Sequence, residues 1–167
     1  MTITKPEPLE AHHNRALCDS STPELDDWLK NYAWQAHRSE STKVYVIHED
    51  LRVVGFYALS AGSVRPNRAP ARLAKGQGNY DLPLVILTRL AVDQSIRGNG
   101  FGAALLKDVL ARVTGAADIV GVRALHAHAK DEAARKFYEH FGFEASPIDP
   151  HGMLLLMKDL RAVLPHR

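Results

Sequence analysis

The chain has 167 residues, of which 46% are hydrophobic and 24% are charged, and its formal net charge is only +2. This composition is ordinary for a soluble globular protein, and the length suits one domain spanning residues 1–167. The small net charge excludes a polycation that binds nucleic acid along its whole length. A single cysteine, Cys18, excludes an internal disulfide and suits a reducing compartment.

Neither a secretion signal nor a membrane span is expected. The first residues lack the apolar core of a signal peptide, and the longest apolar run, residues 82–92, is interrupted by Thr88 and Arg89. We therefore expect a cytoplasmic protein with no membrane partner.

The elements expected along the chain alternate between helices and strands. Thr22 followed by Pro23 predicts the start of a helix that continues to Tyr32. The other expected elements are strands at 42–47 and 52–63, a loop at 65–80 with a short helix near 68–75, a strand buried on both faces at 84–92, a helix at 101–113, a strand at 122–129, a helix from Asp131 to a left-handed cap at Gly142, and a last strand at 153–157.

The most informative segment is the turn between the strand at 84–92 and the helix that follows it. Arg97, Gly100 and Gly102 fit the pattern Arg/Gln-x-x-Gly-x-Gly, and Gly98 adds a further glycine. Glycines let a backbone approach a ligand closely, and a helix start directs free N–H groups at an anion. The segment therefore predicts a pyrophosphate site, with a glycine-rich turn that binds nothing as the alternative.

Two other phosphate-binding loops do not fit this segment. A P-loop requires Lys-Ser or Lys-Thr after the last glycine, and neither dipeptide follows Gly102. The dinucleotide fingerprint requires Gly-x-Gly-x-x-Gly, and the spacing of Gly98, Gly100 and Gly102 differs from it. The segment resembles instead the acetyl-CoA loop of the GNAT acetyltransferases.

A second segment, Ala133-Ala-Arg-Lys-Phe-Tyr-Glu-His-Phe-Gly-Phe143, resembles the GNAT pattern Ala-x-x-Phe-Tyr-x-x-x-Gly-Phe. The resemblance implies that Tyr138 is the catalytic residue, acting as general acid toward the departing thiolate of CoA. A phenol can play this part because it is protonated at neutral pH. Taken alone, Tyr138 and the nearby phenylalanines also fit a role as core residues.

The resemblance implies an α/β protein with the GNAT acyl-CoA N-acyltransferase fold, a mixed central sheet flanked by helices, and acetyl-CoA as co-substrate. The residues that it assigns to acetyl-CoA lie on the central strand, the glycine-rich turn and the later helix: Leu90, Ala91, Val92, Arg97, Gly98, Asn99, Gly100, Phe101, Gly102, Ala103, Asp131, Ala134 and Phe137.

Further segments narrow the resemblance to the GNAT toxins of bacterial type II toxin–antitoxin systems. The carrying segments are Leu25-Asp-Asp-Trp-Leu29, Val53-Val-Gly-Phe-Tyr-Ala-Leu59, Leu87-Thr-Arg-Leu-Ala-Val-Asp93 and the end of the chain from Ser146 to Leu160. The resemblance implies acetylation of the α-amine of aminoacyl-tRNA, which inhibits translation. It also implies a ribbon-helix-helix antitoxin as partner, operator DNA contacted only through the antitoxin complex, and a homodimer.

Basic residues give independent support for a nucleic-acid substrate. No acidic residue lies between Ala61 and Tyr80, and cations in such a segment can follow a phosphate backbone. The alternative is a polar loop that carries solvated charge. We expect the substrate-binding residues to be Arg65, Arg68, Arg72, Lys75 and Arg89.

Two other functions stay open from the sequence. One is a GNAT enzyme that acetylates a small amine or a protein N-terminus, and the other is a module that binds CoA or a partner without catalysis. No metal is expected, because His126 and His128 share a strand face without a third ligand at suitable spacing. The expected strand at 84–92 contains no carboxylate to act as general base, which favours an α-amine acceptor over a lysine side chain.

Overall fold

The computed structural model describes residues 2–164, which form two compact units. Among the described residues, unit 1 comprises 2–60 and 88–109, and unit 2 comprises 61–87 and 110–164. The strands have the order β1-β2-β3-β4-β5-β7-β6 in one mixed sheet, and β3 and β4 each contribute residues to both units.

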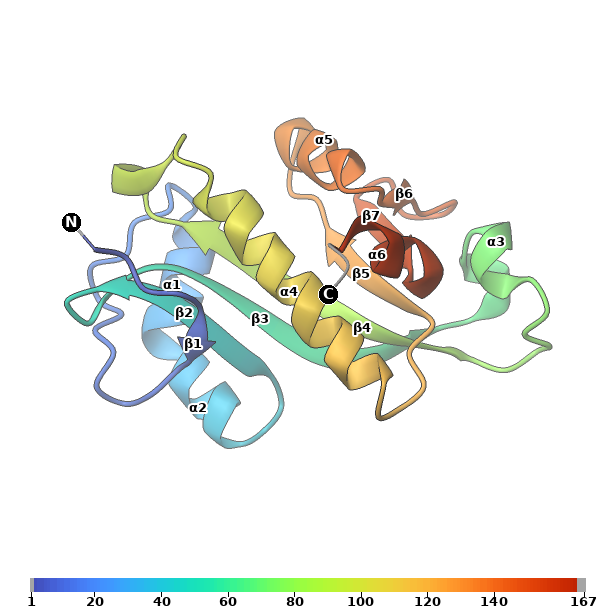
Figure 1. The fold of residues 1–167 in the computed structure, drawn as a ribbon, viewed down its shortest axis with the longest axis horizontal. Coiled ribbons are helices and arrows are strands. Elements are labelled where there is room, and N and C mark those ends of the chain that lie inside the picture. Colours follow the sequence, from blue (N-terminus) through green and yellow to red (C-terminus); the bar gives the residue numbers. More distant parts are fainter. Residues whose placement is uncertain (1, 165–167) are drawn as a thin grey trace. The chain divides into compact units, whose positions relative to one another are not determined.

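Unit 1 is built on an antiparallel hairpin of β2 (Lys43–Glu49) and β3 (Arg52–Val64), with β1 (Glu7–Pro8) beside β2 (Figure 1). The hairpin turn consists of Asp50 and Leu51, which both have a positive φ, of 48° and 70°. Positive φ at both central residues is the requirement of a type I′ turn, whose twist matches that of the strands.

Helices α1 (Pro23–Asn31) and α2 (Ala33–Arg38) contribute apolar residues to the core of unit 1. The sequence predicted one helix through Tyr32, but Tyr32 leaves the helical conformation and separates the two. The start at Pro23 is confirmed, although the Thr22 side chain makes no capping bond. The core of unit 1 is formed by these residues: Leu9, Cys18, Leu29, Ala33, Val44, Val46, Val53, Phe56, Ala58 and Ala91.

The C-terminal end of β4 (Leu82–Val92) lies in unit 1 and leads through a 3₁₀ turn, η2 (Gln94–Ile96), to the long helix α4 (Phe101–Ala117). The strand was expected to be buried on both faces, and this is wrong in detail. Thr88, Arg89 and Leu90 are only partly buried. A mostly apolar segment predicts that a strand is buried as a whole, but it does not give the burial of each residue. This segment also contains a threonine and an arginine, which are polar.

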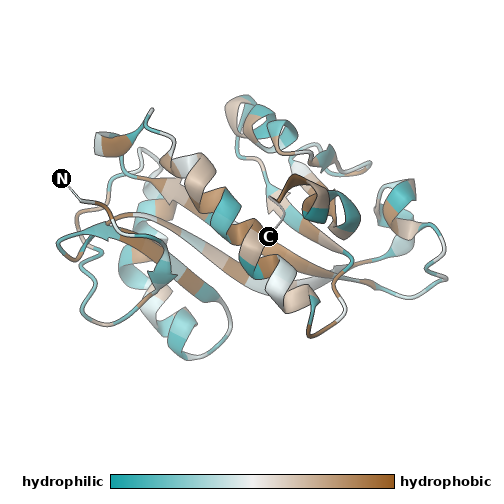
Figure 2. Cartoon of the chain, in the orientation of Figure 1, coloured by the Kyte–Doolittle hydropathy of each residue, from teal (hydrophilic) through white to brown (hydrophobic). Residues whose placement is uncertain are grey.

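Unit 2 contains the N-terminal half of β4, which pairs in parallel with β5 (Ala124–His128). β5 pairs antiparallel with β7 (Gly152–Leu156), and β7 pairs with the short β6 (Glu144–Ala145). In Figure 2, α5 (Glu132–His140) carries teal over much of its surface.

Three short elements complete unit 2: η1 (Pro66–Arg68), α3 (Ala71–Ala74) and α6 (Met157–Val163). The short helix expected near 68–75 therefore exists as a 3₁₀ turn and a single α-helical turn. Helix α6 and the two-residue strands β1 and β6 were not predicted from the sequence.

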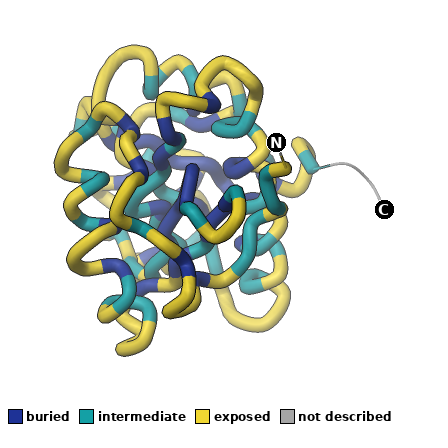
Figure 3. The backbone as a smooth tube through the Cα atoms, turned by 90° about the vertical axis from the view of Figure 1, so that its left-hand side faces the viewer, coloured by how far each residue is buried: buried dark blue, intermediate teal, exposed yellow. Residues whose placement is uncertain are grey.

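Figure 3 shows buried stretches in dark blue and exposed turns in yellow. Within residues 2–164, no helix is long and apolar enough to cross a membrane.

Candidate functional site

A buried carboxylate, Asp93, fixes the chain where β4 ends. Its Oδ1 accepts a hydrogen bond from the Asp19 N–H at 2.8 Å, and its Oδ2 accepts the N–H and hydroxyl of Ser95 at 2.9 and 2.5 Å. Burial raises the pKa of Asp93, but the bonds from Ser95 and Asp19 outweigh it, so the pKa lies below its usual value. Asp93 therefore stays ionised and caps η2, a role that sequence reasoning did not assign to it.

The turn after η2, residues 97–103, is here called the glycine loop. Gly98 and Gly100 have φ of 80° and 81°, in the left-handed region that glycine adopts without strain. A Cβ placed on either would meet no atom within 4 Å. These two glycines are therefore required by backbone conformation, and the space beside them is open.

The glycine loop presents a series of unpaired backbone donors. The Arg97 N–H donates to the Gln94 carbonyl at 3.2 Å, and the Ala104 N–H donates to the Gly100 carbonyl at 3.0 Å. Between these two donors, the N–H groups of residues 98–103 have no acceptor in the described part of the chain. Unpaired N–H groups at the start of a helix form an anion site, because they combine free donors with the positive end of the helix dipole.

The side chains of Arg97 and Asn99 hold the glycine loop in place. The Arg97 guanidinium donates to the Ser20 carbonyl and lies 3.4 Å from the Ser21 hydroxyl. Asn99 Nδ2 donates to the Ile96 carbonyl at 3.1 Å. The Arg97 side chain is thus engaged with the chain itself, and its binding of a phosphate stays a prediction.

The predicted acetyl-CoA contacts on the strand, Leu90, Ala91 and Val92, lie at the C-terminal end of β4. The parallel register of β4 with β5 covers Leu84 to Leu87 and does not extend to these three residues. Their main-chain groups on that edge are therefore outside the ladder of β5.

Tyr138 lies near the end of α5. The sequence correctly predicted this helix. The Asp131 carboxylate accepts the Ala134 N–H at 2.8 Å and begins the helix, and Gly142, with φ of 94°, ends it. Phe137 and Phe143 contact the Tyr138 ring at centroid distances of 5.3 and 5.1 Å.

The Tyr138 hydroxyl has no partner among residues 2–164. The residue is 6% exposed, its hydroxyl makes no hydrogen bond with residues 2–164, and it is not among their fully buried, unpartnered polar atoms. The hydroxyl therefore lies at the surface of an otherwise buried ring. Burial raises the pKa of Tyr138 to about 12, so the phenol stays protonated at physiological pH.

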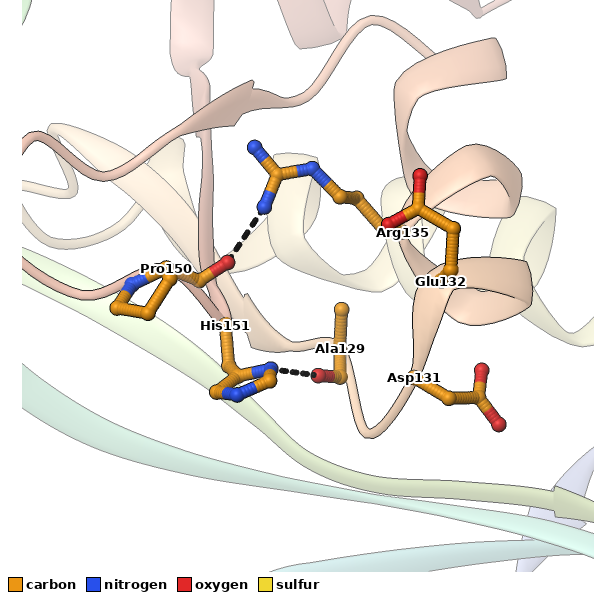
Figure 4. Close-up of a pocket in the computed structure, with 6 residues that line it drawn as sticks. All are labelled: Ala129, Asp131, Glu132, Arg135, Pro150 and His151. Carbon is orange, nitrogen blue, oxygen red and sulfur yellow. Dashed lines mark hydrogen bonds between the residues drawn. The ribbon is translucent and has the colours of Figure 1, made fainter.

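A small pocket of about 230 Å³ lies beside the start of α5 (Figure 4). Arg135 donates to the Pro150 carbonyl at 2.5 Å, and His151 Nδ1 donates to the Ala129 carbonyl at 3.2 Å. Asp131 and Glu132 complete the lining. Asp131 therefore both caps α5 and borders a pocket, whereas Ala134 is only partly buried on the helix.

The predicted basic residues of unit 2 fall into two groups. Arg72 binds Glu144 and Asp159, and Arg65 lies 3.7 Å from Asp81. Two further exposed residues have no ion pair with any described residue: Arg68 and Lys75. The segment contains no acid of its own, but acids from elsewhere in the sequence neutralise half of its cations.

Arg89, in unit 1, differs from all four. Its guanidinium lies 4.0 Å from the centre of the Trp28 ring, and it is partly buried in β4. Trp28, on α1, was not predicted as a site residue, because a tryptophan at helical spacing is usually a core residue.

Two histidines and a glutamate form a cluster that the sequence did not predict. Glu7, His13 and His48 are the only described residues that bring three possible metal ligands together. Each histidine Nδ1 accepts a backbone N–H, from Glu10 and Leu51, so each Nε2 carries the proton and donates to Glu7 Oε1 at 2.8 Å. Metal-binding Nε2 normally requires a protonated Nδ1. The arrangement is therefore a hydrogen-bond network, here called the Glu7 network.

The lone cysteine, Cys18, is buried in the core of unit 1. Burial, with the nearby carboxylates of Asp93 and Asp26, raises the pKa of its thiol to about 12. The thiolate is the reactive form, so Cys18 is not a nucleophile.

A comparison with known protein families identifies the family of this chain. A model described as an acetyltransferase (GNAT) domain matches residues 40–145. The chain belongs to the GNAT family. The expected α/β fold with a mixed sheet is thereby confirmed.

Three relatives of this GNAT chain are informative. A tRNA-acetylating toxin of Mycobacterium tuberculosis is 45% identical over 145 residues, which cover 87% of each protein. A mutant of KacT has the same fold, with a TM-score of 0.89 at 24% identity over 98% of this chain and 100% of KacT. AtaTR bound with AcCoA matches with a TM-score of 0.84 at 25% identity, over 96% of this chain and 97% of the other.

Proposed function

We propose that this protein transfers acetyl from acetyl-CoA to the α-amine of aminoacyl-tRNA and thereby inhibits translation as a toxin. The observation that carries the acetyl transfer is the row of unpaired N–H groups at residues 98–103, in a chain that belongs to the GNAT family. The 45% identity to a tRNA-acetylating toxin supports the acceptor.

The glycine loop fits the pyrophosphate of CoA. Its unpaired donors match an anion that has several oxygens, and the open space beside Gly98 and Gly100 lets that anion approach the backbone. Leu90, Ala91 and Val92 supply main-chain groups for the pantetheine arm. AtaTR, a relative of the same fold, binds AcCoA, which supports this assignment.

Tyr138 is proposed as the general acid. Acetyl-CoA supplies a thioester whose departing sulfur needs a proton or a hydrogen bond. The Tyr138 hydroxyl has no competing partner within residues 2–164, and its pKa of about 12 keeps the proton in place until transfer. We also propose that CoA contacts Asp131, the N-cap of α5, and two residues on the helix itself, Ala134 and Phe137.

The acceptor is proposed to be an α-amine because an α-amine loses its proton near physiological pH without a general base. Its ordinary pKa of about 7.7–8.0 means that a large fraction is already a nucleophile at physiological pH. β4 contains no Asp or Glu between Leu82 and Val92. A lysine acceptor, with an ordinary pKa of about 10.4, would depend far more on such a base.

The remaining parts of the proposal concern partners. We infer that the protein is cytoplasmic and forms a homodimer. We also infer that a ribbon-helix-helix antitoxin neutralises it, and that it contacts operator DNA only in the complex with this antitoxin. Structures described as a KacTA-DNA complex and an AtaT-AtaR complex bound to DNA are similar to this chain and support such assemblies. Size measurement in solution, with and without the co-expressed antitoxin, tests both partners.

The decisive experiment uses labelled acetyl-CoA and a pool of aminoacylated tRNA. We expect label on the amino acid of charged tRNA and none on uncharged tRNA, because the nucleophile is the α-amine. Label on no aminoacyl-tRNA, with transfer to small amines or protein N-termini, would overturn the acceptor and leave acetyl transfer in place. A protein that binds acetyl-CoA but transfers to no amine would be the non-catalytic module.

A further inference from the structure

The stack of Arg89 on Trp28 joins the central strand to the first helix of unit 1. The guanidinium carbon lies 4.0 Å from the Trp28 ring centre, well within the range of a cation–π contact. Trp28 in turn stacks on Phe56 of β3, with ring centroids 6.1 Å apart and planes 13° apart. The Trp28 ring therefore contacts both Phe56 of the core and the guanidinium of Arg89.

The charge of Arg89 has no counter-ion among residues 2–164. No hydrogen bond or ion pair of its side chain exists in this part of the chain, and burial alone lowers the pKa of the group. Seven other arginines have at least one partner within residues 2–164: Arg52 with Asp93, Arg65 with Asp81, Arg72 with Glu144 and Asp159, Arg97 with Ser20, Arg123 with Leu73, Arg135 with Glu139 and Arg161 with Asp118. Arg52 also keeps a buried Nε without a partner, and Arg15, Arg38 and Arg68 share with Arg89 the lack of an ion pair in this part of the chain. Among these four, Arg89 is the one in the central strand, stacked on a ring that packs on the core.

The chemistry of this stack distinguishes it from an ion pair. A carboxylate partner would neutralise the guanidinium and occupy its donors, whereas an aromatic face orients the group and leaves its charge and N–H edges free. A planar guanidinium held in this way suits an oxyanion that accepts two parallel hydrogen bonds.

We propose that Trp28 positions Arg89 as the binding group for a phosphodiester of the acceptor RNA, so that this pair selects aminoacyl-RNA over free amines. The inference rests on the proposed function. Among oxyanions, a phosphodiester is favoured over a carboxylate because the aminoacyl group is an ester and brings no carboxylate of its own. Trp28 is thus a positioning residue, and Arg89 is the residue that contacts the substrate.

The test compares three acceptors that carry the same amino acid. They are an aminoacylated RNA minihelix, the amino acid amide, which has no anion, and the free amino acid, which has a carboxylate. For Arg89→Gln we expect KM for the minihelix to rise roughly 10- to 100-fold, the range for losing a charged hydrogen bond. The efficiency of the minihelix relative to the amide should fall by about the same factor.

Salt dependence provides a readout that a merely structural role would not change. Losing one phosphate contact should reduce the slope of log KM against log salt by about 0.7–0.9. Arg89→Lys keeps the charge but loses the planar donors. It should therefore keep the slope while KM rises. Trp28→Leu should resemble Arg89→Gln in direction and add little to it in the double variant.

The matched control is Arg38→Gln. Arg38 lies 5.8 Å from the Trp34 ring, so it makes the same kind of contact, but it is exposed on α2. We expect this control to leave KM and the salt slope unchanged. Trp28 also packs against the core, so thermal unfolding accompanies each variant. If Trp28→Leu does not fold, Trp28→Phe, with its weaker cation–π contact, takes its place.

Three results would overturn the inference. The first is that Arg89→Gln lowers the catalytic efficiency for the minihelix and for the amide by the same factor. The second is that Arg89→Gln leaves KM for the minihelix and its salt slope unchanged. The third is that the wild-type protein prefers the free amino acid to the amide and that Arg89→Gln abolishes this preference. A wild-type protein that acetylates the amide but no aminoacylated RNA would instead refute the proposed function itself, and the two failures are thereby distinguishable.

Discussion

The glycine loop and the Glu7 network both lie in unit 1, and they use hydrogen-bonding groups in opposite ways. In the Glu7 network, both nitrogens of His13 and of His48 have partners, and Glu7 receives both Nε2 donors. In the glycine loop, the N–H groups of residues 98–103 have no acceptor within residues 2–164. The ring nitrogens of the Glu7 network are therefore already occupied, whereas the glycine loop keeps donors available to a ligand, because a ligand binds to groups that the fold has left free.

The largest effect is expected at Tyr138, whose hydroxyl is another polar group without a partner in the described chain. Tyr138→Phe should bind acetyl-CoA normally and lose about 10²–10⁴-fold in the rate of transfer, the usual contribution of a positioned acid. Single-turnover acetylation measures this loss, with Tyr32→Phe, which removes an exposed hydroxyl, as the control. Near wild-type transfer by Tyr138→Phe would assign the proton to another group or to water.

The pH dependence sharpens the same assignment. Because burial raises the pKa of Tyr138 to about 12, the phenol stays protonated across the assay range. The rate should rise with pH as the acceptor α-amine loses its proton, near its ordinary pKa of about 7.7–8.0 or below, and then stay level. A fall in rate between about pH 9 and 10, absent from Tyr138→Phe, would contradict the raised pKa.

A backbone change tests the free donors directly. Gly100→Val places a β-branched residue at φ of 81°. The strain of about 1–3 kcal/mol should be relieved by moving the loop. Acetyl-CoA should then bind roughly 10- to 100-fold more weakly by calorimetry. Gly76→Val is the matched control, because Gly76 has φ of 76° and equally open surroundings but lies outside the glycine loop. Equal losses in both variants would show that the effect is general strain.

The cations of unit 2 are expected to differ in function according to whether they already have an ion pair within the described residues. Neutralising Arg68 and Lys75, which have no ion pair among residues 2–164, should raise KM for aminoacyl-tRNA and reduce its salt slope by about 1.4–1.8 for two lost contacts. Arg72→Gln should chiefly lower the melting temperature, because Arg72 is bound to Glu144 and Asp159. A larger change of salt slope in Arg72→Gln than in the Arg68 and Lys75 variant would reverse this ranking.

The smallest effect is expected in the Glu7 network. Glu7→Gln should cost about 1 kcal/mol in the free energy of unfolding, because the carboxylate is partly exposed and its two bonds are screened by water. Hydrogen bonds from His13, and then from His48, lower the pKa of Glu7 against the opposing effect of burial. The stabilisation is therefore full above its ordinary pKa of about 4.3 and is lost as the pH falls through the lower folded value. Urea unfolding at pH 7 and pH 3 measures it, and a variant that loses acetyl transfer at pH 7 would contradict a purely structural role.

Much of the fold could be predicted because local signals agree with it. Thr22-Pro23, the glycines at 98 and 100, Asp131 and Gly142 each mark an element boundary that the structure contains. The elements that were missed are short, with two to seven residues each: β1, α2, η2, β6 and α6. Such elements depend on partners distant in sequence, which periodicity does not report. That residues 1–167 act as one domain stays a prediction, and a single unfolding transition would support it.

The candidate site was predictable to a different degree in each part. The glycine loop follows from spacing, because the backbone there has few alternatives. The engagement of Arg97 with Ser20, of Arg72 with Glu144 and Asp159, and of Arg89 with Trp28 was not predictable. A side-chain partner that is distant in sequence leaves no local pattern, so a sequence indicates that a cation is present but not whether it is free.

The burial of Cys18 has a practical consequence for all of these measurements. The protein has one native thiol, and its raised pKa and burial in the core keep it from reacting with maleimides at neutral pH. A cysteine introduced at an exposed position, such as Lys30→Cys on α1, would therefore be the single attachment point for a fluorophore. Site-specific labelling then needs no removal of the native thiol, and RNA association can be followed by anisotropy in a protein whose core is unaltered.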